Sequence, residues 1–296
     1  MSITKKAWIR YIDTDTPKIE LKDPIAIVGS PGLRSVGKIV VDELVKELEP
    51  ELFAELYSYG FPGIYYGPSY LGAPCSAGAQ IVGNNVAELP VVRVYILYKS
   101  QEQAQTQIQT QTQTQTQTHD RDIVMVTGYQ AYDALNQYIV AEKLTDLFTE
   151  LQITEVISLG AQVVEKKVRC CATDVELVAA MSKYGIEKTH VDRFIGLTGL
   201  VTAIARKKSI KGVCLFASTE QNLTEPEYPD FTAAKELLEK VEAVVGLKVD
   251  AFGLEENRRR ENEQIEENTK RAEEERIYQE KERERERDGD TPIGYA

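Results

Sequence analysis

A glycine-rich segment is the first candidate for chemistry in this chain. Gly32-Leu33-Arg34-Ser35-Val36-Gly37-Lys38-Ile39 matches the phosphate-binding pattern G-x-x-x-x-G-K-[ST] up to its last position. It follows a predicted strand and opens a predicted helix, the context in which backbone N–H groups hold phosphates. However, Ile39 stands where a hydroxyl should bind magnesium, and Asp122 precedes its strand instead of following it. We interpret the segment as a tight turn that packs a strand against a helix, and keep a nucleotide-binding enzyme using Gly32 to Lys38 as the alternative.

The cysteines and histidines form no recognisable site. Cys75, Cys170, Cys171 and Cys214 contain no C-x-x-C spacing, and four cysteines in 296 residues do not make a disulfide framework. We expect buried free thiols at all four positions, with Cys170 and Cys171 pointing to opposite faces of a strand. A zinc site would need more ligands than His119 and His190 supply, and neither G-x-S-x-G nor H-E-x-x-H occurs. The sequence predicts no catalytic residue, no metal site and no cofactor.

The last four residues are the candidate binding site. Ile293, Gly294, Tyr295 and Ala296 follow Gly289 and Pro292, which end a highly charged segment. A free carboxylate beside an aromatic ring can enter a pocket that supplies backbone donors or a cation. We therefore expect a flexible docking tail over residues 289–296, with a frayed terminus as the alternative that composition alone favours.

Charge and hydropathy exclude several classes of partner. The net charge is -12 and the isoelectric point is about 4.9, whereas nucleic-acid binding depends on lysine and arginine neutralising phosphates. No apolar run is long enough to span a bilayer, and Met1 to Trp8 has no apolar stretch after its lysines. We expect no nucleic-acid partner, no membrane partner and a cytoplasmic location.

Residues 1–250 alternate β-rich apolar runs with amphipathic helices, which indicates an α/β domain. The order strand, helix, strand predicts a mostly parallel sheet covered on both faces. Strands are expected at 24–28, 91–98, 123–127, 156–159, 168–172 and 213–217, and helices at 35–48, 135–151, 174–183, 199–208 and 231–245.

Two segments break this alternation. Residues 100–120 are dominated by alternating Gln and Thr, which we interpret as a solvent-exposed insertion in a surface loop. Residues 254–288 pair opposite charges at helical spacing, as in Glu256 and Arg260, and from Leu254 to Ala296 there are 15 acidic residues against 10 lysines and arginines. The apolar positions keep no heptad register, so the pattern predicts a charged single helix instead of a coiled coil.

The body from about Ile25 to Asp250 resembles the proteasome assembly chaperone 2 family, including its archaeal members. The resemblance is carried by Val28-Gly29-Ser30-Pro31-Gly32-Leu33-Arg34-Ser35-Val36-Gly37, by Val126-Thr127-Gly128-Tyr129-Gln130-Ala131, and by Gly196-Leu197-Thr198-Gly199-Leu200 followed by Gly212 to Ala217. The chain departs from the pattern at Gly160-Ala161 and in the Gln/Thr insertion.

The resemblance implies a three-layer α/β/α sandwich of the phosphorylase or hydrolase kind, here with a C-terminal charged helical extension. It also implies a non-enzymatic chaperone that forms a homo-oligomer and binds proteasome α subunits or the α ring. The tail is similar to the hydrophobic-tyrosine-any tail of proteasome activators: Tyr295 and the Ala296 carboxylate match it. Gly294 lacks the hydrophobic side chain, and Ile293 lies one position too early. A third possibility is a structural oligomer organised by residues 101–118.

Overall fold

A computed structural model gives the fold of residues 7–13, 19–61, 79–99, 121–130, 134–163, 166–220 and 228–260, and of positions 263, 270, 276 and 278. These are the described residues. The chain divides into two compact units, Met1–Ala251 and Phe252–Ala296. The Gln/Thr insertion at 100–120 and the tail at 289–296 lie outside the described residues.

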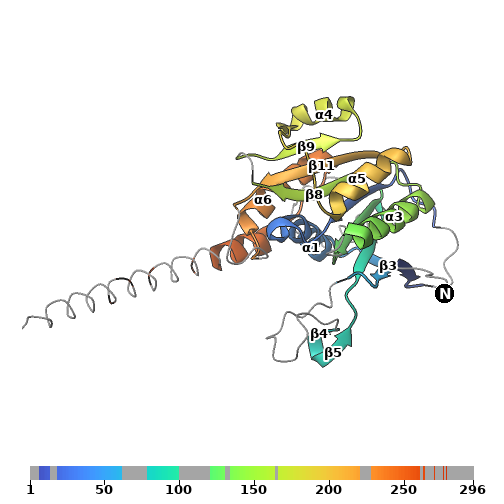
Figure 1. Ribbon diagram of the computed structural model, residues 1–296, viewed down its shortest axis with the longest axis horizontal. Helices are drawn as coiled ribbons and strands as arrows, with labels where there is room; N and C mark the ends of the chain where they lie inside the picture. The colour runs from blue at the N-terminus through green and yellow to red at the C-terminus, as the bar shows by residue number, and fades with distance from the viewer. Residues whose placement is uncertain are drawn as a thin grey trace, which may run out of the picture. The chain divides into compact units, whose positions relative to one another are not determined.

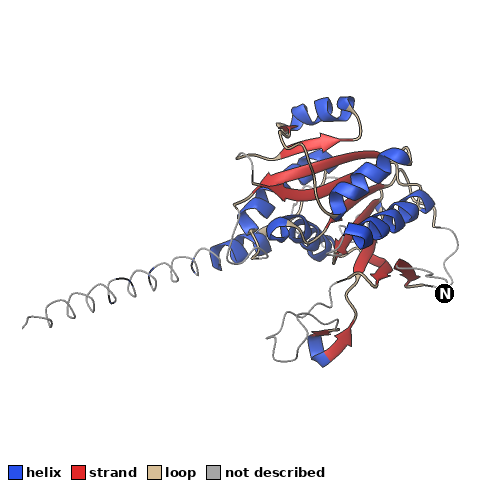
Figure 2. Ribbon diagram, viewed as in Figure 1, coloured by secondary structure: helices blue, strands red, loops and turns tan. Residues whose placement is uncertain are grey.

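The first unit is built on a nine-stranded sheet (Figures 1 and 2). The strands follow the order β1-β3-β6-β7-β2-β8-β11-β9-β10. Their bounds are Ala7–Tyr11 (β1), Ile25–Gly29 (β2), Glu51–Ser58 (β3), Val92–Leu97 (β6), Ile123–Gly128 (β7), Glu155–Gln162 (β8), Arg169–Ala172 (β9), Glu187–Lys188 (β10) and Lys211–Ser218 (β11). A separate hairpin pairs Gln80–Val82 (β4) with Val86–Glu88 (β5).

Helices cover both faces of the parallel centre of the sheet, so the predicted three layers are confirmed. Val36–Leu48 (α1) packs against Phe231–Val245 (α6) on one face, and Ala134–Glu150 (α3) against Leu197–Lys207 (α5) on the other (Figure 1). The short helix Val175–Met181 (α4) packs on the edge strands β9 and β10.

The expectation of a mostly parallel sheet is wrong. The strands β7, β2, β8 and β11 are parallel neighbours, but β1, β3, β6 and β7 pair antiparallel, as do β11 and β9. Strands β1, β3 and β10 and the β4–β5 hairpin were not predicted. Antiparallel strands with one face less covered carry mixed polar and apolar residues, which weakens the apolar runs used to find them.

Burial explains which segments were easy to find. All five residues of β2 are buried, as expected for a central strand covered on both faces. Alternate residues of β2 point to opposite faces of the sheet. Ala26 and Val28 lie on the face covered by α3 and α5, in a buried cluster that includes Leu144 and Phe148. The predicted α6 bounds are confirmed, because Asp230 caps the Ala233 N–H at 2.9 Å and Gly246, at φ 81°, ends the helix.

The three described cysteines are free thiols, as predicted, but not all of them are buried. Cys170 and Cys214 are buried, while Cys171 is only half-buried. Cys171 lies opposite Cys214 on β11, and a hydrogen bond from the Cys214 thiol lowers the pKa of Cys171. Burial instead raises the pKa of Cys170 to about 11. Cys75 lies outside the described residues.

The second unit begins with a helix over 252–260. The predicted i,i+4 pair is confirmed, because Arg260 Nη2 donates to Glu256 Oε1 at 2.5 Å. Arg259 lies 4.0 Å from the Glu263 carboxylate. Across both units, no helix of the described residues is long and apolar enough to cross a membrane.

Candidate functional site

The predicted binding residues Ile293, Gly294, Tyr295 and Ala296 lie outside the described residues. They therefore stay a prediction from the sequence. The features that the structure does describe are the glycine-rich turn and two hollows in the first unit.

The glycine-rich turn packs α1 against the sheet, as its structural interpretation predicts. A Cβ added at Gly37 would overlap the carbonyl of Leu159 in β8, and one added at Gly29 would overlap the carbonyl of Gly37. Only glycine permits this approach of helix backbone to strand backbone. The turn itself places Arg34 and Ser35 in the left-handed region, at φ 51° and 55°.

The basic side chains of the turn are already bound by the protein. Lys38 pairs with Asp42 one helical turn later, and Asp42 also accepts a bond from Thr127 Oγ1. Arg34 donates to the Tyr228 and Pro229 carbonyls at 2.9 and 3.0 Å and lies 3.6 Å from Asp230. These contacts link the turn to α1 and to the start of α6.

Asp122 also has a structural role. Its carboxylate accepts the backbone N–H groups of Lys22 at 2.6 Å and Lys99 at 3.0 Å. It therefore joins the segment before β2 to the segment after β6. Its carboxylate is engaged in these backbone contacts and does not serve as an acidic metal ligand for the glycine-rich turn. Among the described residues, no group of three or more His, Cys, Asp or Glu side chains gathers to hold a metal ion.

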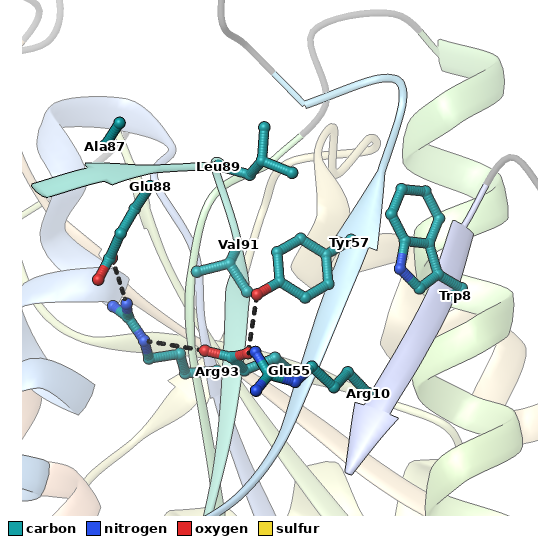
Figure 3. A pocket seen from close by; sticks show the side chains of 9 residues that line it. All are labelled: Trp8, Arg10, Glu55, Tyr57, Ala87, Glu88, Leu89, Val91 and Arg93. Carbon is teal, nitrogen blue, oxygen red and sulfur yellow. Dashed lines mark hydrogen bonds and ion pairs between the residues drawn. The ribbon is translucent and has the colours of Figure 1, made fainter. Parts of the chain in front are cut away.

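A hollow of about 370 Å³ lies between the antiparallel strands and the β4–β5 hairpin (Figure 3). Its floor is a row of side chains on one face of β1, β3 and β6, while the opposite face of these strands packs toward α3. Its lining residues are Trp8, Arg10, Glu55, Tyr57, Ala87, Glu88, Leu89, Val91 and Arg93.

Glu55 is the electrostatic centre of this hollow. The register places it directly between Arg10 on β1 and Arg93 on β6, so opposite charges alternate across the three strands. Arg10 Nη1 donates to Glu55 Oε2 at 3.3 Å, and the Tyr57 hydroxyl donates to the same oxygen at 2.7 Å. Arg93 Nε lies 3.9 Å from the other oxygen, while its Nη2 bonds Glu88 at 2.8 Å and so connects the hairpin (Figure 3).

One side of the hollow is formed by stacked aromatic rings. The rings of Trp8 and Tyr57 are stacked at 5.7 Å, and Tyr59, which is 80% exposed, lies 5.1 Å from Trp8. Burial, followed by the hydrogen bond to Glu55, raises the pKa of Tyr57. The site therefore holds a neutral phenol against a carboxylate shared by two arginines.

We expect Glu55→Gln to lower the free energy of unfolding by about 1–2 kcal/mol, because the two guanidinium groups lose their shared anion. Urea unfolding followed by circular dichroism measures this loss. Glu88→Gln is the matched control. Within the described part of the chain Glu88 is bound by Arg93 alone, and it is more exposed than Glu55, so this substitution should lower the free energy of unfolding by less than about 0.5 kcal/mol. A double-mutant cycle with Tyr57→Phe should show coupling of about 1 kcal/mol, and independent effects would contradict the shared hydrogen bond.

Sequence reasoning missed this hollow because its residues carry no motif. They come from three strands and a hairpin, and only the register brings Arg10, Glu55 and Arg93 into one row. The available signal was the alternation of β1, where Trp8 and Arg10 share a face and Ala7 and Ile9 share the other.

The fold defines an α/β/α sandwich whose sheet has a parallel centre, β7-β2-β8-β11, flanked on each side by antiparallel pairs. Within that class, the chain belongs to the PAC2 family, whose model matches residues 26–271. An uncharacterized protein of Methanocaldococcus jannaschii is 26% identical over 276 residues, covering 91% of this chain and 92% of that protein.

Two solved structures from Pyrococcus furiosus share the fold. PbaB, described as an archaeal proteasome activator, has a TM-score of 0.68 and 24% identity, covering 89% of this chain and 98% of PbaB. PbaA, described as an archaeal homolog of proteasome-assembly chaperone, has a TM-score of 0.66 and 19% identity, covering 95% of this chain and 98% of PbaA.

Proposed function

We propose that this chain is a non-enzymatic proteasome assembly chaperone or adaptor of archaeal type that binds proteasome α subunits. The observation that carries the proposal is the terminal Tyr295-Ala296 on a chain that belongs to the PAC2 family. The likeness to PbaB and PbaA supports it, because PbaB is an archaeal proteasome activator and PbaA is an archaeal homolog of proteasome-assembly chaperone.

In this proposal the tail enters pockets between neighbouring α subunits. The Ala296 carboxylate is the anion that such a pocket would hold, and the Tyr295 ring adds apolar area and a hydroxyl. Gly294 supplies no side chain, so a single tail binds weakly. A homo-oligomer presents several tails together, and their effective concentration offsets the weak single contact.

The charged segment has a physical part in this proposal. Its 15 acidic and 10 basic residues from Leu254 to Ala296 keep it solvated, and pairs such as Glu256 and Arg260 support a helix without a core. A helix over residues 254–288, rising about 1.5 Å per residue, would be on the order of 50 Å long and would end next to the tail.

The test is binding to the proteasome α ring of the same organism, in isolated and mature form, by the full chain and by a chain that lacks residues 294–296. We expect the full chain to bind and the shortened chain to lose most of its affinity. Equal binding by both forms would remove the tail from the mechanism. Failure of both forms to bind either particle would overturn the proposed function.

The alternative, a nucleotide-binding enzyme that uses Gly32 to Lys38, predicts heat on mixing with ATP or GTP and magnesium. Because Lys38 is paired with Asp42 and Arg34 with Asp230, we expect no such heat. Binding that Lys38→Ala abolishes would establish this alternative. The structural oligomer organised by residues 101–118 predicts a changed mass in light scattering when they are deleted.

A further inference from the structure

A second cavity, of about 400 Å³, lies at the carboxyl ends of the central strands. Its walls come from the loop after β2, the end of β8, the loop before α5, and Phe216 of β11. The chain leaves β7 for α3 on one face of the sheet and leaves β2 for α1 on the other. The cavity therefore sits at a topological switch point, where open α/β sheets bind ligands. Its volume falls in the range of small-molecule sites, roughly 300–1,000 Å³.

Buried polar side chains line this cavity without partners. Ser30 is 6% exposed and Thr198 5%, and neither hydroxyl has a hydrogen-bond partner among the described residues. Gln162, 7% exposed, accepts a bond from Thr189 Oγ1 at 2.8 Å, and within the same part of the chain its amide nitrogen has no partner. These three groups open into the cavity, where a polar ligand would supply the hydrogen bonds that buried polar groups normally make.

The charge around the cavity favours an anion. Arg193 is the one charged residue in its described lining, and no described residue forms an ion pair with it. The helix α5 begins at the cavity with Gly196, at φ 119°, as its N-cap and no side-chain cap. Its first N–H groups, including that of Thr198, therefore have no partner within the helix and carry partial positive charge.

The remaining wall is apolar and partly aromatic. Phe194 and Phe216 meet edge to face with their centroids 4.4 Å apart, and Leu33, Leu159 and Ile195 complete the lining. Ile195 is 85% exposed, so it stands at the open side of the cavity. Aromatic and aliphatic walls of this kind accept a flat apolar group.

The geometry points to a binding site for a small organic anion, with a phosphate or carboxylate head and a flat apolar body. The head accepts hydrogen bonds from the Ser30 and Thr198 hydroxyls, the first N–H groups of α5 and the Arg193 guanidinium. The ring lies against Phe194 and Phe216. The cavity shares Gly32, Leu33 and Gly37 with the glycine-rich turn, but Lys38 is outside its lining, so the proposed anion is held without the lysine that the nucleotide-binding alternative requires. The inference does not depend on the proposed binding of proteasome subunits.

Calorimetry on the full chain with phenyl phosphate, benzoate and benzyl alcohol tests the site, because the three probes share a ring and differ in the head. We expect one anion, phenyl phosphate or benzoate, to bind at least about tenfold more tightly than benzyl alcohol, since charge-assisted hydrogen bonds are the strong ones. The stronger of the two anions identifies the head. Equal binding of all three probes, or no binding of either anion, would overturn the inference.

Substitutions locate the anion. Arg193→Gln and the isosteric Thr198→Val should each weaken binding about tenfold, and Thr198→Ser should restore it by returning the hydroxyl. Arg206→Gln, at the far end of α5, and Lys38→Ala are controls that should bind as the parent does. Circular dichroism confirms that each variant is folded. Binding that is unchanged in both Arg193→Gln and Thr198→Val would place the anion elsewhere and refute the site.

Discussion

Replacing Gly37 with alanine is expected to lower the free energy of unfolding by about 3 kcal/mol or more, a large share of the 5–15 kcal/mol typical of a domain. The added Cβ would overlap the Leu159 carbonyl, and backbone atoms of β8 cannot rotate away as a side chain can. In an exposed helix the same change would stabilise by about 0.5–1 kcal/mol, so the sign of the effect identifies the close approach.

Gly83→Ala is the matched control for this experiment. Gly83 lies in the β4–β5 hairpin, and a Cβ there meets no heavy atom within 4 Å. We expect a change within about 0.5 kcal/mol, as for other surface substitutions. Urea unfolding monitored by far-ultraviolet circular dichroism compares the variants. A Gly37→Ala protein as stable as the parent would contradict the packing role of the turn.

Substitutions in the tail are expected to change affinity for the proteasome α ring in opposite directions. Tyr295→Ala removes a ring and its hydroxyl, and should weaken binding by about 2 kcal/mol or more, roughly thirtyfold. Gly294→Leu supplies the missing hydrophobic side chain and should strengthen binding by about 1.5–3 kcal/mol if that side chain becomes fully buried.

Surface-immobilised α rings and soluble chain allow both affinities to be measured by interferometry. Tyr278→Ala is the control, because Tyr278 is a 63% exposed tyrosine in the same unit but not in the tail. It should bind as the parent does. If Gly294→Leu binds no better while Tyr295→Ala still binds worse, the tail uses its ring without the hydrophobic pocket that the resemblance implies.

The central part of the fold could be predicted from the sequence because its signals are local. Strand β2 is an unbroken apolar run. Helix α6 is bounded in the sequence by its N-cap residue Asp230 and its C-cap residue Gly246. The helix α5 begins two residues before the predicted Gly199, at Leu197, because Gly196 adopts the positive φ of its cap. The sequence alone does not indicate whether Gly196 or Gly199 is the last residue of the loop before α5.

The candidate sites also differ in whether local sequence signals are enough to find them. The terminal tail is contiguous, so residue types and order suffice to propose its chemistry. The hollow around Glu55 and the cavity beneath Arg193 are assembled from residues up to about 190 positions apart, between Ser30 and Phe216, and no motif marks them. A polar side chain in these sites can be recognised as a candidate binding group only when its burial and its hydrogen-bond partners are known.

Periodicity, composition and order along the chain were enough to predict the alternation of strands and helices, the charged segment and the residues of the tail. The folded chain was needed to find the strand order, the antiparallel half of the sheet, the row Arg10-Glu55-Arg93 and the contact of Gly37 with β8. Pairing and packing join residues that are distant in the chain, and their free energy depends on register and close approach, which local patterns do not contain.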